Sequence, residues 1–129
     1  MTKSEIKLLV EMAKKVRKNA YSPYFKVYVG AALLAHDGTI HVGCNVENAS
    51  GSAIVCAESN AIAAGVAAGY RKFKAVAVVG FPDKLLFPCG VCRQKLVEFS
   101  PDMDVYVATT KGKIKHLKLG KLIPHMVRL

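Results

Sequence analysis

Apolar residues near the start of the chain recur at steps of three and four positions. They are Ile6, Leu9, Val10, Ala13 and Val16. This spacing places the apolar side chains on one face of a helix, predicted over residues 4–19. Ser22-Pro23 then excludes further helix, because the residue before a proline is pushed towards extended backbone. The chain therefore begins with one amphipathic helix that packs against something apolar.

After this helix the pattern changes to continuous apolar runs, which are typical of buried strands. The run over 27–35 is followed by Asp37-Gly38, a hairpin turn, and 39–46 is predicted to return as the partner strand. Two further apolar runs, 73–79 and 103–109, are predicted as strands of the same sheet.

The strands are separated by segments with helical character. The alanine-rich stretch 56–68 stops at Gly69, which is typical of a helix with a glycine end. A second short helix is predicted over 89–99, and loops are predicted over 48–52 and 81–88. The last segment, which ends near Pro124, fits either a strand or a helix.

This order of elements predicts the fold class. An initial hairpin followed by strands joined through helices implies an α/β fold, a three-layer α/β/α sandwich around a five-stranded mixed sheet. With 129 residues, we expect one domain over 1–129. No apolar run reaches the roughly 18 residues of a membrane span, and the first residues do not resemble a signal peptide. We therefore expect a cytoplasmic protein with no membrane partner.

The charge balance bears on whether the protein binds nucleic acid. The chain has 19 basic and 9 acidic residues, a net charge of +10. The basic residues form two groups: Lys3, Lys7, Lys14, Lys15, Arg17 and Lys18, and Lys111, Lys113, Lys115, Lys118 and Lys121. Neither group is interleaved with aromatic residues that stack on bases. Solvated faces are the favoured interpretation, and a polynucleotide-binding module is the alternative.

The cysteines point to a metal. Pro88 precedes a Cys89-x-x-Cys92 pair at the head of a predicted helix, and Cys56 stands at the head of another. Such spacings in a cytosolic chain indicate metal binding before disulfides. Three ligands leave a fourth position for water, as in catalytic zinc sites, whereas structural zinc is closed by four. Cys44 lies at a strand end without a paired cysteine, so we expect a buried core cysteine rather than a fourth ligand.

Two charged residues next to these cysteines have possible roles at the metal. Glu58, two positions after Cys56, falls in the first helical turn, where a carboxylate can take a proton from metal-bound water. The alternative is a glutamate that only complements the helix dipole. Because Zn²⁺ with three thiolates is formally −1, a positive neighbour should matter, and Arg93 is the candidate.

A set of motifs over nearly the whole chain resembles the small single-domain cytidine deaminases. The motifs are Tyr21-Ser22-Pro23-Tyr24, Val29-Gly30-Ala31-Ala32-Leu33, Asp37-Gly38, Gly43-Cys44-Asn45-Val46-Glu47-Asn48-Ala49, Cys56-Ala57-Glu58 and Pro88-Cys89-Gly90-Val91-Cys92-Arg93-Gln94. The resemblance implies a cytidine-deaminase-like fold with one Zn²⁺ held by Cys56, Cys89 and Cys92, and proton transfer by Glu58. It also implies hydrolysis of cytidine and 2'-deoxycytidine in pyrimidine salvage, by a homotetramer.

The resemblance further assigns residues to the substrate. Asn45 and Glu47 are expected to bind ribose hydroxyls, the alternative being hydrogen bonds within a turn. The carbonyl of Ala57 and the pair Phe87-Pro88 are expected near the exocyclic amino group. Arg93, Gln94 and Ser59 are expected beside the zinc ligands.

The chain departs from the family pattern at four positions. Ser59 stands where arginine usually follows Cys-Ala-Glu, and aromatic residues are replaced at three positions: Val27, which is still expected to contact the substrate, Gly51 and Val127. Phe25 and Tyr28 flank Val27, but a one-residue displacement reverses side-chain direction on a strand. Aromatic contacts with a base contribute about 1–3 kcal/mol each. Their loss favours weaker cytidine binding or a bulkier substrate, with Phe87 refilling part of the space.

Four functions follow from these observations. The first is a deaminase of free cytidine nucleosides, and the second a deaminase of a modified or bulkier cytosine nucleoside such as a blasticidin-type antibiotic. The third is a polynucleotide binder or deaminase. The fourth is a non-catalytic zinc protein in which Glu58 has no chemical role. The missing aromatics leave a dimer open beside the homotetramer.

Overall fold

The computed structural model describes residues 1–129. The helices and strands, in chain order, are α1 (Lys3–Arg17), β1 (Gly30–Ala35), β2 (Ile40–Cys44), the 3₁₀ turn η1 (Gly51–Ala53), α2 (Ala57–Ala67), β3 (Phe73–Val79), α3 (Gly90–Phe99), β4 (Asp104–Ala108), β5 (Ile114–Lys118) and α4 (Leu119–Leu122). None of the helices combines the length and the apolar character that a membrane-spanning helix requires.

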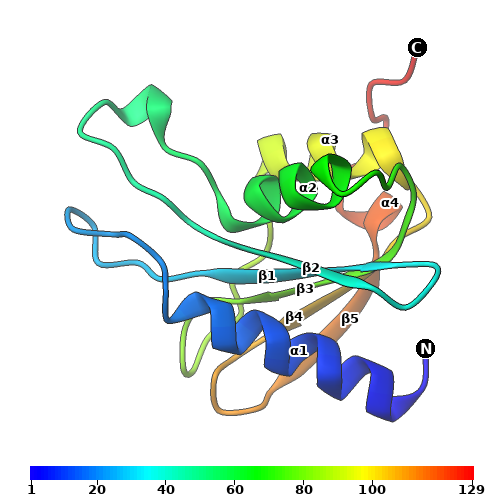
Figure 1. Cartoon of the computed structure of the whole chain (residues 1–129), viewed down its shortest axis with the longest axis horizontal. Helices are drawn as coiled ribbons and strands as arrows, with labels where there is room; N and C mark the ends of the chain where they lie inside the picture. Colours follow the sequence, from blue (N-terminus) through cyan, green and yellow to red (C-terminus); the bar gives the residue numbers. More distant parts are fainter.

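The strands form one mixed sheet in the order β2-β1-β3-β4-β5. Only β3 and β4 are parallel, joined by a crossover through α3, and the other neighbours are antiparallel. Helix α1 covers one face of the sheet, and α2, α3 and α4 cover the other (Figure 1). The predicted α/β/α sandwich around a five-stranded mixed sheet is confirmed.

The core consists of two apolar layers, one on each face of the sheet. Along β1, Ala31 and Leu33 face α2 and α3, whereas Ala32 and Leu34 pack towards Leu9 of α1. Because both faces are covered, every residue of β1 is buried. This explains why the apolar runs are continuous: successive side chains point to opposite faces of the sheet, and both faces are apolar.

The largest difference from the sequence-based elements lies before β1. The strand predicted over 27–35 begins only at Gly30, because side chains take the hydrogen bonds that a ladder would otherwise use. The Val27 N–H donates to Ser22 Oγ, and the Val29 N–H donates to Asn45 Oδ1. The partner strand predicted over 39–46 likewise stops at Cys44. The last segment contains both alternatives, strand β5 followed by helix α4.

Gly43 allows α2 to lie directly on β2. A Cβ at this position would stand 2.3 Å from the Ala61 nitrogen and 2.5 Å from the Ala57 oxygen. Both atoms are helix backbone, so neither could move aside alone. The missing side chain therefore sets the height of α2, and with it the position of Cys56 and Glu58 above the sheet.

The Gly43→Ala variant is expected to lose about 1–3 kcal/mol of stability, because the added methyl group displaces α2 from the sheet. The matched control is Gly51→Ala, since a Cβ at Gly51 meets no heavy atom within 4 Å. Urea unfolding of both variants tests the prediction. Equal stability of the two would show that α2 does not depend on this contact.

Candidate metal centre and adjoining pocket

The three predicted zinc ligands come from the N-terminal ends of two neighbouring helices. Cys56 is the N-cap of α2 and Cys89 the N-cap of α3, and neither sulfur caps its own helix. Cys92 lies one turn into α3, so it shares a face with Cys89. Both helix N-termini direct partial positive charge towards the sulfurs, which favours the thiolate form.

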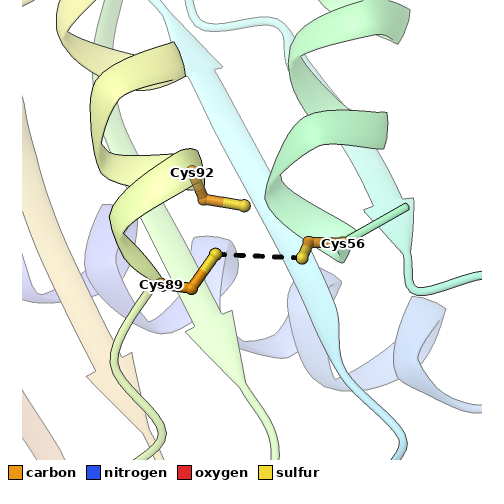
Figure 2. A group of neighbouring side chains, drawn as sticks. All are labelled: Cys56, Cys89 and Cys92. Atoms are coloured by element: carbon orange, nitrogen blue, oxygen red, sulfur yellow. Dashed lines mark hydrogen bonds between the residues drawn. The ribbon is translucent and has the colours of Figure 1, made fainter. Parts of the chain in front are cut away.

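The sulfur atoms meet at one point (Figure 2). Cys56 Sγ and Cys89 Sγ are 4.0 Å apart, and all three sulfurs lie within 4.8 Å of one another. Tetrahedral zinc with Zn–S distances of about 2.3 Å needs sulfurs about 3.8 Å apart. The donor set therefore fits one Zn²⁺ after small shifts of the side chains. Cys44 is not part of the group, as predicted, although it is partly exposed rather than buried in the core.

The exposure of the cysteines shows which side of the metal centre is accessible. Cys92 is fully buried, Cys56 is half-buried and Cys89 is exposed. Interaction with the Cys92 thiol lowers the pKa of Cys56, whereas that interaction and burial raise the pKa of Cys92. Cys56 and Cys89 line a pocket and Cys92 does not. The accessible side of the metal centre thus faces this pocket.

The pocket has a volume of about 280 Å³ and mostly apolar walls. Its apolar side chains include Phe25, Val27, Val29, Ile54, Leu86 and Phe87. Its polar side chains are Cys56, Cys89, Asn45, Glu47 and Glu58. An apolar pocket with a few convergent polar groups suits a flat heterocycle whose polar edge must be oriented.

Glu58 is the second residue of α2 and lines the pocket beside the cysteines. Its side chain is only 5% exposed and forms no salt bridge. Burial raises the pKa of the Glu58 carboxyl above its ordinary value, against the opposing effect of a backbone N–H. A surface carboxylate that only complements the helix dipole would be hydrated. The position of Glu58 therefore favours proton transfer over the dipole alternative.

Asn45 and Glu47 lie just beyond β2 and are both buried in the pocket wall. Asn45 accepts from the Val29 N–H at 2.8 Å and donates to the Val27 carbonyl at 2.7 Å. One amide proton and one lone pair of Asn45 are left for a ligand. Asn45 therefore forms hydrogen bonds to a distant segment of the chain, rather than within a turn as the sequence-based alternative had it, and keeps capacity for a substrate.

Glu47 has a similar double capacity. Its carboxylate accepts from the Ser22 hydroxyl and from the N–H groups of Tyr24 and Phe25. Burial opposes ionisation, but these donors outweigh it and lower the pKa of Glu47. A carboxylate has about four acceptor sites, so one remains for a hydroxyl group in the pocket.

The aromatic lining differs from the sequence-based expectation at one residue. Val27 and Phe87 line the pocket as predicted. Phe25 also lines it, although a continuous strand would have directed its side chain to the opposite face. That rule fails because residues 23–25 form a turn and Lys26 has a φ of 57°. Gly51 and Val127, the other positions without the expected aromatic residue, do not line the pocket.

The carbonyl group of Ala57 does not point where the expected contact with the exocyclic amino group of the substrate requires. Ala57 lines the pocket, but its carbonyl oxygen faces Gly43 of β2. The N–H groups of the first turn of α2 have no acceptor within the helix. The start of α2 therefore offers donors to a ligand rather than the carbonyl of Ala57.

Arg93 and Gln94 bind the C-terminal segment instead of the sulfurs. Arg93 donates to the Pro88 carbonyl at 2.6 Å and to the Leu122 carbonyl at 2.7 Å. Gln94 exchanges two hydrogen bonds with the backbone of Val127. None of these bonds reaches a cysteine, so Arg93 steadies the loop that precedes Cys89 rather than contacting a thiolate.

Ser59 does contact a cysteine, and it brings in a residue that the sequence analysis missed. Ser59 Oγ is 3.5 Å from Cys92 Sγ and accepts a hydrogen bond from Lys95 Nζ at 3.1 Å. Lys95 follows Cys92 by three positions, the spacing that puts two side chains on one helix face. That spacing is the signal that could have found it.

An α/β/α sandwich in which a cluster of three cysteines adjoins a pocket with a buried carboxyl has the composition of a catalytic zinc site. The family model for the cytidine and deoxycytidylate deaminase zinc-binding region matches residues 3–109. The chain belongs to this family of zinc-dependent deaminases.

Individual relatives agree with this assignment. A cytidine deaminase from Sporosarcina psychrophila is 46% identical over 93% of this chain and 89% of its own length. The crystal structure of cytidine deaminase from Burkholderia pseudomallei superposes with a TM-score of 0.91, at 42% identity, over 98% of this chain and all of that one. A blasticidin-S deaminase from Bacillus cereus is 31% identical over 77% of this chain and 76% of its own length.

Proposed function

We propose that the protein hydrolyses the amino group of cytidine and 2'-deoxycytidine, giving uridine or 2'-deoxyuridine and ammonia. The observation that carries the proposal is that Glu58, Cys56 and Cys89 line one apolar pocket. The metal centre, the proton carrier and the space for a pyrimidine are thus at the same place.

The roles follow from what each side chain can do there. Cys56, Cys89 and Cys92 would hold Zn²⁺, which supplies Lewis-acid activation of a water molecule. Glu58 accepts a proton from the attacking water and delivers it to N3 of the pyrimidine, and it then passes the second proton, taken from the hydroxyl group added at C4, to the departing amino group. One water is consumed and one ammonia released, and Glu58 ends in its starting protonation state. The apolar walls exclude other water from the base.

The ribose is proposed to bind at Asn45 and Glu47, through the hydrogen-bonding capacity that the protein leaves unused. Glu47→Gln is expected to raise KM for cytidine about tenfold or more, since a hydrogen bond to a charged group contributes about 1.5–3 kcal/mol. Steady-state kinetics beside Glu98→Gln, an exposed glutamate on α3, measure the effect. A lower kcat with an unchanged KM would contradict ribose binding.

We also propose a homotetramer. The two loops before β1 and after β2 project beyond the same end of the sheet (Figure 1), and both carry exposed apolar side chains. They are Tyr21, Tyr24, Phe25, Tyr28, Val46 and Val55. Isolated bridges pair Val46 with Tyr21 and with Val55, so the two loops lie side by side. Phe25 belongs both to this exposed apolar group and to the pocket wall, which favours a second copy of the chain as the partner that covers the group. Sedimentation velocity tests whether a tetramer, a dimer or a monomer is present.

The basic residues of α1 do not favour a polynucleotide substrate, because they lie on the face of the sheet opposite to α2 and α3, which carry the cysteines. A free nucleoside therefore remains the proposed partner. Three thiolates require reducing conditions, which supports a cytoplasmic location. A free nucleoside as substrate fits an enzyme of pyrimidine salvage.

A modified cytosine nucleoside is the second candidate, because Val27 leaves space in the pocket where the family pattern has an aromatic residue. Phe25 and Phe87 restore part of that aromatic wall, which favours cytidine. Ammonia release from cytidine, 2'-deoxycytidine and blasticidin S, measured side by side, separates the two. Turnover of blasticidin S with none of cytidine would overturn the proposed substrate.

A further inference from the structure

Lys95 and Ser59 form a hydrogen-bonded chain that ends on the most buried metal ligand. The ammonium group of Lys95 donates to Ser59 Oγ at 3.1 Å, and Ser59 Oγ stands 3.5 Å from Cys92 Sγ. Ser59 is only 8% exposed and Cys92 is not exposed at all. Because lysine has no acceptor, the Ser59 oxygen must accept from it, which leaves the hydroxyl proton free to donate to the sulfur.

The direction of this chain matches the charge of the site. Three thiolates around Zn²⁺ carry a net charge of −1, and Cys92 is the ligand without access to solvent. A buried charge is costly unless a hydrogen bond or an opposite charge compensates it. A lysine that polarises a hydroxyl group strengthens the donation of that hydroxyl to the thiolate.

No other basic side chain has this connection. Arg93 is the adjacent basic residue, but its hydrogen bonds end on the carbonyls of Pro88 and Leu122. Lys95 is an exposed residue, whereas Ser59 is buried where α2 contacts α3 and links the lysine to Cys92.

We propose that Lys95, acting through the Ser59 hydroxyl, compensates the negative charge of the Cys92 thiolate and thereby strengthens zinc binding. Lys95 and Ser59 are then positioning residues of the metal centre and do not touch the substrate. The inference rests on the proposed ligand set, so its test measures metal affinity and includes a ligand variant.

The test is competition for Zn²⁺ between a chromophoric chelator and the purified full-length variants at one pH and ionic strength. Lys95→Gln and Ser59→Ala are each expected to weaken zinc binding about 10–100-fold, the usual effect of removing a partner of a ligand. Lys95→Arg should restore most of the affinity. The matched control is Lys7→Gln, the same charge change at an exposed position of α1.

The double variant Ser59→Ala/Lys95→Gln should lose no more affinity than the stronger single variant, because the two residues act in series. Equal affinities of Lys95→Gln and Lys7→Gln, or additive losses in the double variant, would overturn the relay. Cys92→Ser separates this failure from a wrong ligand set: if it too binds zinc normally, the metal site itself is misassigned. Lys95 is exposed, so its variants are expected to fold.

Discussion

Glu58→Gln is expected to lower kcat for cytidine by about 10²–10⁴-fold while one zinc ion per chain is retained. Glutamine keeps the shape of the side chain but can neither accept a proton from water nor carry one to the base. The residue lies on the pocket wall and is not a member of the sulfur cluster, so metal content should not change. Steady-state kinetics and elemental analysis of the same preparation measure both quantities.

The matched control for this variant is Glu98→Gln, which makes the same chemical change at an exposed position of α3. It should keep the activity of the unmodified enzyme. Activity of Glu58→Gln close to that of the control would mean that the buried carboxyl takes no part in the reaction. Glu58 would then be only a first-turn residue that complements the dipole of α2.

Cys92→Ser is expected to abolish both zinc retention and turnover. Cys92 is the buried ligand, and its loss leaves two sulfurs on the pocket side, one fewer than a catalytic zinc site uses. Because metal binding contributes to the stability of the folded state, the variant should also melt at a lower temperature than the zinc-loaded enzyme. Dialysis against a chelator, elemental analysis and thermal unfolding test these effects.

Cys44→Ser is the control for cysteine loss, since Cys44 lies outside the sulfur cluster. It should retain one zinc ion and full turnover. Zinc bound normally by Cys92→Ser, together with zinc loss in Cys44→Ser, would place the metal on a different set of sulfurs.

Most of the fold could be predicted because its signals are local. The apolar run 73–79 corresponds to β3 without change, and the helices after Cys56 and Cys89 begin one residue later than predicted. The metal ligands could be predicted for the same reason. Two cysteines three positions apart at a helix start must share a face, whatever the rest of the chain does.

The destinations of long polar side chains could not be predicted from neighbours in the sequence. Arg93 follows Cys92 directly, yet its guanidinium group donates to the carbonyl oxygen of Leu122. The position of that oxygen depends on how the C-terminal segment packs. Lys95 meets Ser59 across the contact between α2 and α3. Each outcome is decided by packing between elements that are distant in the chain.

The segment before β1 shows how side chains override a strand pattern. Its apolar sequence fits a continuous strand, but Asn45 and Ser22 take up the N–H groups of Val29 and Val27. The backbone then turns, and Phe25 faces the pocket. A hydrogen bond between residues 16 positions apart leaves no trace in local periodicity.

X-ray absorption at the zinc edge of the purified, active enzyme tests the metal centre most directly. Three sulfur scatterers at about 2.3 Å and one lighter atom at about 2.0 Å are expected, because Cys56, Cys89 and Cys92 leave one position for water. Four sulfur scatterers would mean that another cysteine closes the site and that no water can be activated there. That result would contradict the proposed hydrolysis.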